Sequence, residues 1–385
     1  MASYVDWTSL PTELLDLVSG HLPSERDLLH VRHVCAHWRA SITARPAAPF
    51  RPWVLATRTR PDLTGPNGAY SLWLPRGVRA VAVAAPPGLP FCRGTPRGWL
   101  ALADDKWCPT RLVLWDPRTG AEIPLPPMHN VVQVFLSGDP LASPPPASPG
   151  WTAVATHVTE SMDHVLFFWR PGDAAWTPAA RTESCNFFST QNAAFLGGKM
   201  FCVESAERIA IYDLGEGAGA MASSPSPPVH LSAAALSKAH AAYFVAFHGD
   251  LLLVLLFRYR HPNSTRVYNL GPRGPSTRRP YLKLRKRDRV TDLGSYSLLL
   301  GRGDAFALSA EEYPAIRGNC IYYVDHMGVR KERRWASVFD LKSASVVEEI
   351  PFPPEHLENR DEQWWPCSWF CPEKPVLLKR HGTEL

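Results

Sequence analysis

A repeated unit of strand, aromatic residue, polar turn and returning strand runs through most of this chain of 385 residues. The clearest copy is residues 111–127, RLVLWDPRTGAEIPLPP, in which Leu112 and Leu114 alternate before Trp115 and the following residues turn the chain. Short apolar runs bounded by Gly, Pro, Asp and Asn are typical of β-strands. The 38 prolines support the same interpretation, since proline breaks helices but is tolerated between strands. We therefore predict an all-β body from Pro52 onward.

Four further copies of this unit centre on the aromatic residues Trp169, Tyr212, Tyr268 and Phe339. Successive aromatic positions are 54, 43, 56 and 71 residues apart, and a glycine-led strand precedes four of the five by 14 to 21 residues, the scale of a hairpin. These spacings bracket the roughly 40 to 50 residues of a four-stranded propeller blade. The size of the body then predicts a β-propeller of about six or seven blades. A β-sandwich made of two packed sheets is the alternative architecture.

The first 45 residues follow a helical pattern instead. Apolar residues recur at spacings of three and four within residues 14–22, which predicts a helix that opens near Pro11. Residues 24–27, SERD, resemble a capping box at the start of a second short helix, and apolar residues four apart within residues 34–42 indicate a third. Three short helices in about 35 residues fall below the size at which a core sustains a fold by itself.

The helical segment carries more apolar side chains than one small core can accommodate. Thirteen positions are apolar: Leu10, Leu14, Leu15, Leu17, Val18, Leu22, Leu28, Leu29, Val31, Val34, Cys35, Trp38 and Ile42. A large apolar surface left in water usually marks a contact with another protein. We therefore expect a second protein to cover part of this surface, and packing on the β-rich body of the same chain is the alternative.

Three blocks of this segment resemble the F-box family in order and spacing: LPTELL at residues 10–15, DLL at 27–29 and VCAHWR at 34–39, with Leu22 between the first two. The resemblance implies docking on a Skp-family adaptor, which links the chain to the cullin and RING subunits of a ubiquitin ligase. The adaptor-binding residues implied in this way are Leu10, Pro11, Leu14, Leu15, Val18, Leu22, Leu28, Leu29, Val31, Val34, Cys35 and Trp38.

The rest of the chain resembles the domain of unknown function 295, a KIB-type β-propeller found in a group of plant F-box proteins. The resemblance is carried by RGWLAL at residues 97–102, by residues 112–126 and 298–325, by FDL at Phe339 and by WFCPE at residues 369–373. The two resemblances together imply an α+β multidomain chain. Its parts are a three-helix F-box at residues 4–45, a Pro-rich lead-in at 46–66 and a large all-β, β-propeller-like recognition domain at 67–380.

This arrangement implies a non-catalytic substrate-recognition subunit of a Skp-cullin-F-box ubiquitin ligase. The F-box would bind the adaptor, and the β domain would hold a target protein whose identity is unknown. Ubiquitin transfer takes place on other subunits, so such a receptor needs no catalytic groups of its own. Two alternatives stay open: an F-box scaffold or decoy that acts outside a ligase, and a β-propeller enzyme with a helical cap.

Side chains that could support catalysis or bind a metal have simpler interpretations. The aspartates that might form carboxylate pairs all lie at predicted turns, where aspartate bonds backbone amides: Asp104, Asp105, Asp116, Asp213 and Asp340. His33 and His37 share a helix face, but Cys35 points elsewhere. Cys367 and Cys371 lack the second pair of ligands that a zinc site needs. No phosphate-binding loop or hydrolase elbow occurs, and we expect no cofactor, metal or catalytic centre.

The formal net charge of +5 is too small to indicate a nucleic-acid-binding protein. One dense basic stretch, RRPYLKLRKRDR from Arg278 to Arg289, is interpreted as an amphipathic strand or loop with a solvated face, and a nuclear-import signal or acidic-partner patch is the alternative. The chain starts without a secretory pattern, and its longest apolar run, residues 250–257, is too short for a membrane helix. We expect a protein of the nucleus and/or cytoplasm, with neither a membrane nor a nucleic-acid partner.

Overall fold

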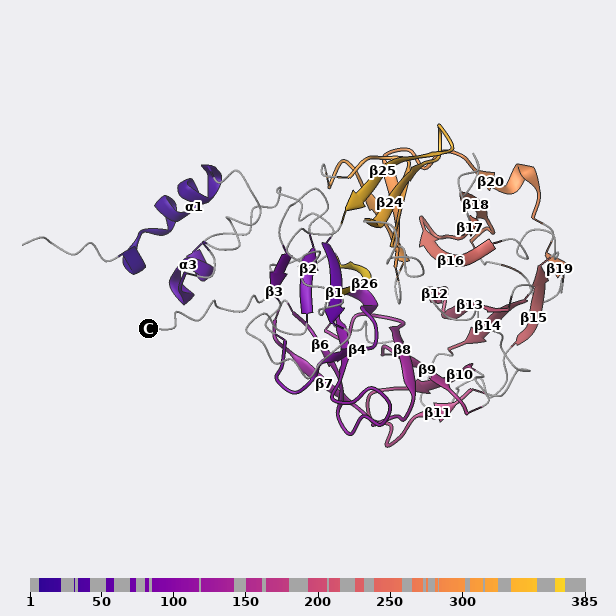
Figure 1. Cartoon of the computed structure of the whole chain (residues 1–385), viewed down its shortest axis with the longest axis horizontal. Coiled ribbons are helices and arrows are strands. Elements are labelled where there is room, and N and C mark those ends of the chain that lie inside the picture. Colours follow the sequence, from indigo (N-terminus) through magenta and orange to yellow (C-terminus); the bar gives the residue numbers. More distant parts are fainter. Residues whose placement is uncertain are drawn as a thin grey trace, which may run out of the picture.

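The computed structural model places a small helical segment ahead of a ring of β-sheets (Figure 1). The residues that it describes are 7–21, 31, 34–41, 53–58, 70–73, 80–82, 85–117, 119–141, 150–160, 164–179, 193–205, 208–214, 226–231, 239–257, 265–272, 275, 281–282, 284–301, 305–313, 316–324, 334–351 and 364–370. Within these residues the β content dominates, as the proline-punctuated strand pattern predicts.

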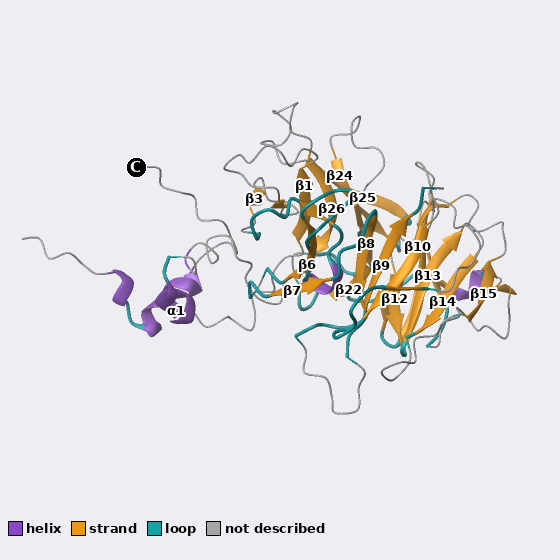
Figure 2. Cartoon of the chain, turned by 90° about the horizontal axis from the view of Figure 1, so that it is seen from below, coloured by secondary structure: helices purple, strands orange, loops and turns teal. Residues whose placement is uncertain are grey.

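The helical segment consists of a short 3-10 helix, η1 (Trp7–Ser9), and two α-helices, α1 (Thr12–His21) and α3 (Ala36–Ser41). The prediction of three helices is corrected to two α-helices in the described part, because the second expected helix falls almost entirely outside the described residues. Figures 1 and 2 both show α1 beside the ring of sheets, with no strand lying across it.

Five sheets of the ring use strands that follow one another along the chain, apart from β19. The first contains β4 (Phe91–Cys92), β5 (Leu100–Ala103), β6 (Leu112–Trp115) and β7 (Glu122–Leu125), and the second contains β8 (Val131–Leu136), β9 (Ala153–Val158), β10 (His164–Trp169) and β11 (Thr177–Pro178). The third contains β12 (Ala193–Leu196), β13 (Lys199–Ser205), β14 (Arg208–Asp213), β15 (Ser226–Leu231) and β19 (Tyr281–Leu282). The fourth contains β16 (Ala239–Phe247), β17 (Asp250–Phe257), β18 (Thr265–Asn269) and β20 (Arg289–Val290). The fifth, in spatial order, contains β22 (Ala305–Ser309), β21 (Tyr296–Leu300), β23 (Cys320–Val324), β24 (Arg334–Asp340) and β25 (Ser345–Pro351).

A sixth sheet joins the first strands of the body to the last one. Its order is β26 (Trp364–Phe370), β1 (Trp53–Arg58), β2 (Tyr70–Trp73) and β3 (Ala80–Ala82). β1 and β26 are antiparallel, with Trp53 opposite Phe370 and Arg58 opposite Trp364. The expected six or seven blades are therefore corrected to five blades of consecutive strands and one composite sheet. The β-sandwich alternative is wrong, because the sheets form a ring instead of two facing layers (Figure 1).

The repeat found in the sequence corresponds to one position in five of the sheets. Its aromatic residues lie at the end, or one residue before the end, of β6, β10, β14, β18 and β24, and all five are buried: Trp115, Trp169, Tyr212, Tyr268 and Phe339. The strand before each copy in the sheet is its antiparallel partner, as in the pairs β5–β6 and β17–β18. The predicted hairpin unit is therefore confirmed.

One related stretch was missed in the sequence. β2 also ends on an aromatic residue, Trp73, and the next residues, LPRG at 74–77, resemble the turn that follows Trp115. The signal was present, but no glycine leads β1, the strand that pairs with β2 and places Val54 opposite Trp73. The remaining distant strand of this sheet, β26, lies at the other end of the chain.

The hydrophobic core lies between neighbouring sheets. Five clusters of buried side chains each combine two adjacent sheets, from the first and second through to the fifth and sixth. Consecutive residues of one strand face opposite clusters, so that Tyr243 packs between the fourth and fifth sheets while Phe244 packs between the third and fourth. Both faces of these strands are buried. Their sequences are therefore continuous apolar runs, such as DLLLVLLF in β17.

The basic stretch lies along the outer strands of two sheets. Tyr281–Leu282, as β19, pairs with β15, and Arg289–Val290, as β20, pairs with β18. The 3-10 helix η3 (Lys286–Asp288) lies between them, and its cations are exposed. The described part fits the interpretation of a strand and loop with a solvated face, and it covers sheet edges that would otherwise be open. Its alternative roles stay predictions.

Gly94 gives a test of how closely the first two sheets approach. Its φ is +130°, and an added Cβ would lie 2.8 Å from the carbonyl oxygen of Val134 in β8. Gly94→Ala should lower the free energy of unfolding by about 3 kcal/mol through backbone strain and this clash. The control is Gly172→Ala, where φ is +99° but nothing lies within 4 Å, and strain alone should cost about 1 kcal/mol. Equal losses in urea denaturation of the two variants would contradict the close approach.

Candidate docking surface

α1 begins where the sequence predicts. The backbone N–H groups of Leu14 and Leu15 both donate to the carbonyl oxygen of Pro11 at 3.1 Å. Proline suits this position because a first-turn N–H has no partner inside the helix. Glu13 lies in the first turn, where a carboxylate interacts favourably with the positive end of the helix dipole.

Side chains of the third block tie α3 to the residues before α1. The indole Nε1–H of Trp38 donates to the carbonyl oxygen of Trp7 at 2.7 Å, and a ring nitrogen of His37, Nε2, bonds the carbonyl oxygen of Leu10 at 2.8 Å. The backbone N–H of Trp38 donates to the Cys35 sulfur at 3.4 Å. These bonds close the helical segment over a span of about thirty residues, and they give Cys35 and Trp38 an internal role.

The two faces of α1 have different environments. Leu15 has no exposed surface and Ser19, one turn later, is buried, so this face lies inside the helical segment. Leu14, Leu17 and Val18 expose 47%, 59% and 43% of their surface. Positions three and four apart lie on one side of a helix, so these three side chains form an apolar stripe toward solvent. We call them the α1 stripe.

The other predicted adaptor-binding residues divide by exposure. Pro11 and Val34 are exposed, while four are half-buried: Leu10, Val31, Cys35 and Trp38. Leu22, Leu28 and Leu29 lie outside the described residues. Two exposed side chains were left out of the predicted set: Trp7, and Leu17, whose spacing of three from Leu14 was the signal that could have included it.

The alternative in which the β-rich body covers these residues is wrong for the α1 stripe. The exposures of Leu14, Leu17 and Val18 are those of the chain with its own sheets present. Figure 2 shows the helical segment apart from the sheets in a second direction of view. Apolar side chains at this spacing on an open helix face form a surface suited to a second protein.

Turn aspartates in the ring accept hydrogen bonds from nearby backbone amides. Asp105 Oδ1 accepts from Trp107 N–H and Cys108 N–H, both at 2.7 Å, and these bonds lower the pKa of its carboxyl group. Asp340 Oδ1 accepts from Lys342 N–H at 2.7 Å in the same manner. Turn chemistry, the predicted role, is confirmed for these two aspartates.

Asp116, another of the predicted turn residues, is fully buried and accepts from the hydroxyl of Thr119 at 2.8 Å. Within the described residues no three His, Cys, Asp or Glu side chains gather in a way that could hold a metal ion. None of the helices in the described part has the length and apolar character needed to cross a membrane.

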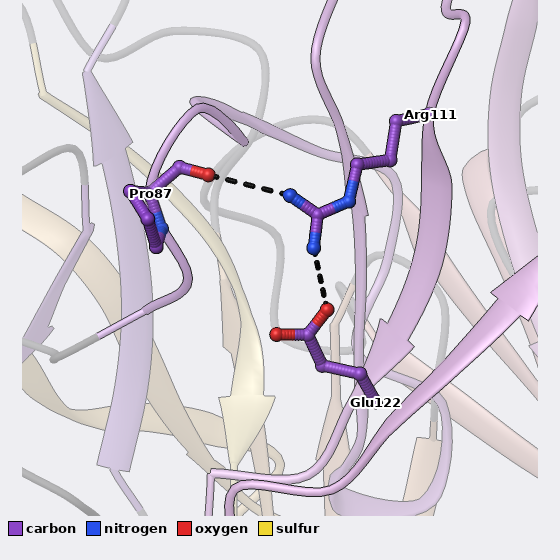
Figure 3. Close-up of polar contacts among 3 residues, drawn as sticks. All are labelled: Pro87, Arg111 and Glu122. Carbon is purple, nitrogen blue, oxygen red and sulfur yellow. Dashed lines mark hydrogen bonds and ion pairs between the residues drawn. The ribbon is translucent and has the colours of Figure 1, made fainter.

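An ion pair on the first sheet also has a structural role (Figure 3). The Arg111 guanidinium donates to Glu122 Oε2 at 2.6 Å and to the carbonyl oxygen of Pro87 at 3.5 Å. It therefore links the start of β6, the start of β7 and the segment before β4. Both side chains are partly exposed, so the pair contributes little to stability and mainly fixes the geometry of this corner.

The described cysteines differ in reactivity for physical reasons. Burial, with a smaller effect from Asp340, raises the pKa of the Cys320 thiol to about 11, whereas Cys108 is exposed. Because the thiolate is the reactive form, native protein at pH 8 should be alkylated by iodoacetamide at Cys108 well before Cys320. Equal labelling rates in peptide mass spectrometry would contradict the burial of Cys320.

The raised pKa of the Cys320 thiol also affects stability. This thiol stabilises the fold below pH 9, and the contribution is lost as the pH rises through about 11.

Comparison with known proteins gives two family matches. The KIB1-4 beta-propeller model matches residues 68–340, more than two thirds of the chain, and an F-box-like model matches residues 7–45. The F-box protein SKIP23 of Arabidopsis thaliana is 34% identical over 120 residues, which cover 29% of this chain and 27% of that protein. A second F-box protein of Arabidopsis thaliana is 30% identical over 136 residues, which cover 34% of each chain. The chain thus matches about a third or less of the length of these relatives.

Solved structures resemble the ring only distantly. A quinoprotein alcohol dehydrogenase-like protein from Bacteroides thetaiotaomicron is 8% identical, with a TM-score of 0.40 over 83% of this chain and 78% of that one. A likeness of this level supports no conclusion about activity.

Proposed function

Because the chain belongs to the KIB1-4 β-propeller family and carries an F-box-like segment ahead of that domain, we propose that it is the substrate-recognition subunit of a Skp-cullin-F-box ubiquitin ligase. In this role the helical segment binds a Skp-family adaptor, and through it the cullin and RING subunits. The ring of sheets binds a target protein. The chain itself is non-catalytic, since ubiquitin transfer occurs on the other subunits, and it works in the nucleus, the cytoplasm or both.

The observation that carries this proposal is the α1 stripe. Three large apolar side chains on one side of a short helix stay in water although a large β domain lies in the same chain. Each fully buried Leu or Val contributes roughly 1.5 to 3 kcal/mol. A micromolar complex has only about 8 kcal/mol of binding free energy, so the α1 stripe could supply much of it.

The proposed adaptor contact keeps most of the residues implied by the F-box resemblance and refines their roles. Exposed Pro11, Leu14, Val18 and Val34 contact the adaptor, and Leu17 joins them. Leu15 supports the surface from inside, because it is already covered by its own chain. Leu10, Val31, Cys35 and Trp38 are half-buried and contact the adaptor with part of their surface, and Leu22, Leu28 and Leu29 keep their proposed role.

A double variant tests the α1 stripe. Leu14→Asp with Val18→Asp removes two apolar contacts and buries two carboxylates, so adaptor binding should weaken by at least 100-fold. The measurement is co-purification and titration calorimetry of the full chain with recombinant adaptor. Glu13→Gln, on an exposed neighbour in the same helix turn, is the matched control and should bind as wild type. Wild-type adaptor affinity in the double variant would overturn the proposed contact.

Removal of residues 1–45 separates the two proposed activities. The truncated chain should keep its targets but lose their ubiquitination, because the ring is left without the adaptor contact. Proximity labelling with the proteasome inhibited, in cells that express either the intact or the truncated chain, should give the same labelled targets. Without the inhibitor, those targets should disappear only with the intact chain. An adaptor complex that lacks the cullin subunit would instead indicate a scaffold or decoy.

A further inference from the structure

The loop between β5 and β6, residues 104–111, carries an exposed tryptophan on the ring. Trp107 exposes 60% of its surface, and within the described residues of the ring the other large apolar side chains that are exposed are aliphatic: Leu141, Val346 and Val347. Tryptophan is costly to leave in water and is enriched among the residues that dominate binding energies in protein interfaces. The exposure of Trp107 therefore indicates a candidate contact surface on this loop.

Hydrogen bonds inside the loop hold its backbone in one conformation. Asp104 Oδ1 accepts from the N–H groups of Thr110 and Arg111, both at 3.0 Å, and the other oxygen accepts from the Thr110 hydroxyl. Asp105 Oδ1 accepts from the N–H groups of Trp107 and Cys108, in the first half of the loop. Two carboxylates thus hold the backbone of this eight-residue loop, and one of them accepts from the N–H of Trp107.

Contacts with neighbouring segments fix the loop to the ring. The Arg93 guanidinium donates to the carbonyl oxygens of Lys106 and Asp105. The N–H of Asn130, in the connection from β7 to β8, donates to the carbonyl oxygen of Trp107 at 2.7 Å. The carbonyl oxygen of Asn130 in turn accepts from the N–H of Val158 at the end of β9 at 3.2 Å. A loop held in this way loses little entropy when a partner binds.

The charged side chains around Trp107 differ in whether a hydrogen bond or an ion pair compensates their charge. The Lys106 ammonium lies 4.8 Å from the centroid of the Trp107 ring. Asp104 and Asp105 accept from donors within the loop, and Arg111 is paired with Glu122. Lys106 makes no ion pair with a described residue, and its ammonium group lies over the indole ring. The loop presents an apolar ring with a cation beside it.

We propose that Trp107 and Lys106 form a recognition point for the target polypeptide, which contributes an apolar side chain flanked by a carboxylate. The apolar side chain packs on the indole ring, and the carboxylate pairs with the Lys106 ammonium. This inference rests on the proposed function, in which the ring holds the target. Nucleic acid fits less well, since a strand of phosphate groups needs a patch of cations, whereas one ammonium group, that of Lys106, lies over the Trp107 ring.

The test uses the full chain, with and without recombinant adaptor, and an array of immobilised peptides as the probe. The array pairs an aromatic or aliphatic residue with Asp or Glu, with Lys or Arg, or with Ser in otherwise identical peptides. Binding should favour the acidic pairs, and Trp107→Ala should weaken those peptides by about 10- to 100-fold. Lys106→Met should keep apolar binding and lose the preference for acidic neighbours. Val347→Ala, at an exposed aliphatic side chain of β25, is the control and should bind as wild type.

The outcomes separate this inference from the proposed function. Adaptor binding is measured on the same preparations, and an unchanged thermal midpoint shows that each variant is folded. If the adaptor binds but no acidic preference is found, or if Trp107→Ala selects the same peptides with the same affinity, the recognition point is overturned and the ligase role stands. Displacement of the peptides by single-stranded oligonucleotides at equal concentration would also overturn it. Peptide selection without adaptor binding would support the recognition point and contradict the ligase role.

Discussion

The antiparallel pairing of β1 with β26 is the interaction on which the rest of the structure depends. The buried clusters lie between sheets, so each sheet needs a neighbour on both sides. An open row of such sheets would leave two apolar faces in water at its ends. Backbone hydrogen bonds between β1 and β26 join the two ends of the row instead, and the composite sheet packs on the fifth sheet through Val54 and Trp369.

Closure also determines how the helical segment is attached. Trp53, the first residue of β1, lies opposite Phe370, the last residue of β26, so the chain enters and leaves the ring at the same end of one sheet. The helical segment is thus joined to the ring at a single place, and the α1 stripe is not needed for the core of the ring. This separation supports the proposal of one binding surface on α1 and a second, for a different partner, on the loops of the ring.

Local patterns predicted the elements well where neighbouring residues decide the structure. The start of α1 at Pro11, the buried aromatic residue of each repeat and the aspartate turns follow from helix-end chemistry, strand burial and side-chain bonds to nearby amides. Where distant residues decide, the predictions were incomplete. Leu15 and Leu14 are adjacent leucines with the same pattern, yet one is enclosed and the other is in water. The pairing of β26 with β1 was not predicted, because the two strands lie about 300 residues apart in the sequence.

The sequence by itself determined the class of the protein: an apolar helical segment with F-box spacing, followed by strands with a period close to one propeller blade. These properties depend on local periodicity, which one chain displays directly. Tertiary structure alone decided that the last strand, β26, completes the sixth sheet, that Leu17 belongs to the exposed stripe and that Trp107 lies in water on a fixed loop. The exposure of a side chain and the closure of the ring depend on contacts between residues that are distant in the sequence. Local periodicity carries no information about those contacts.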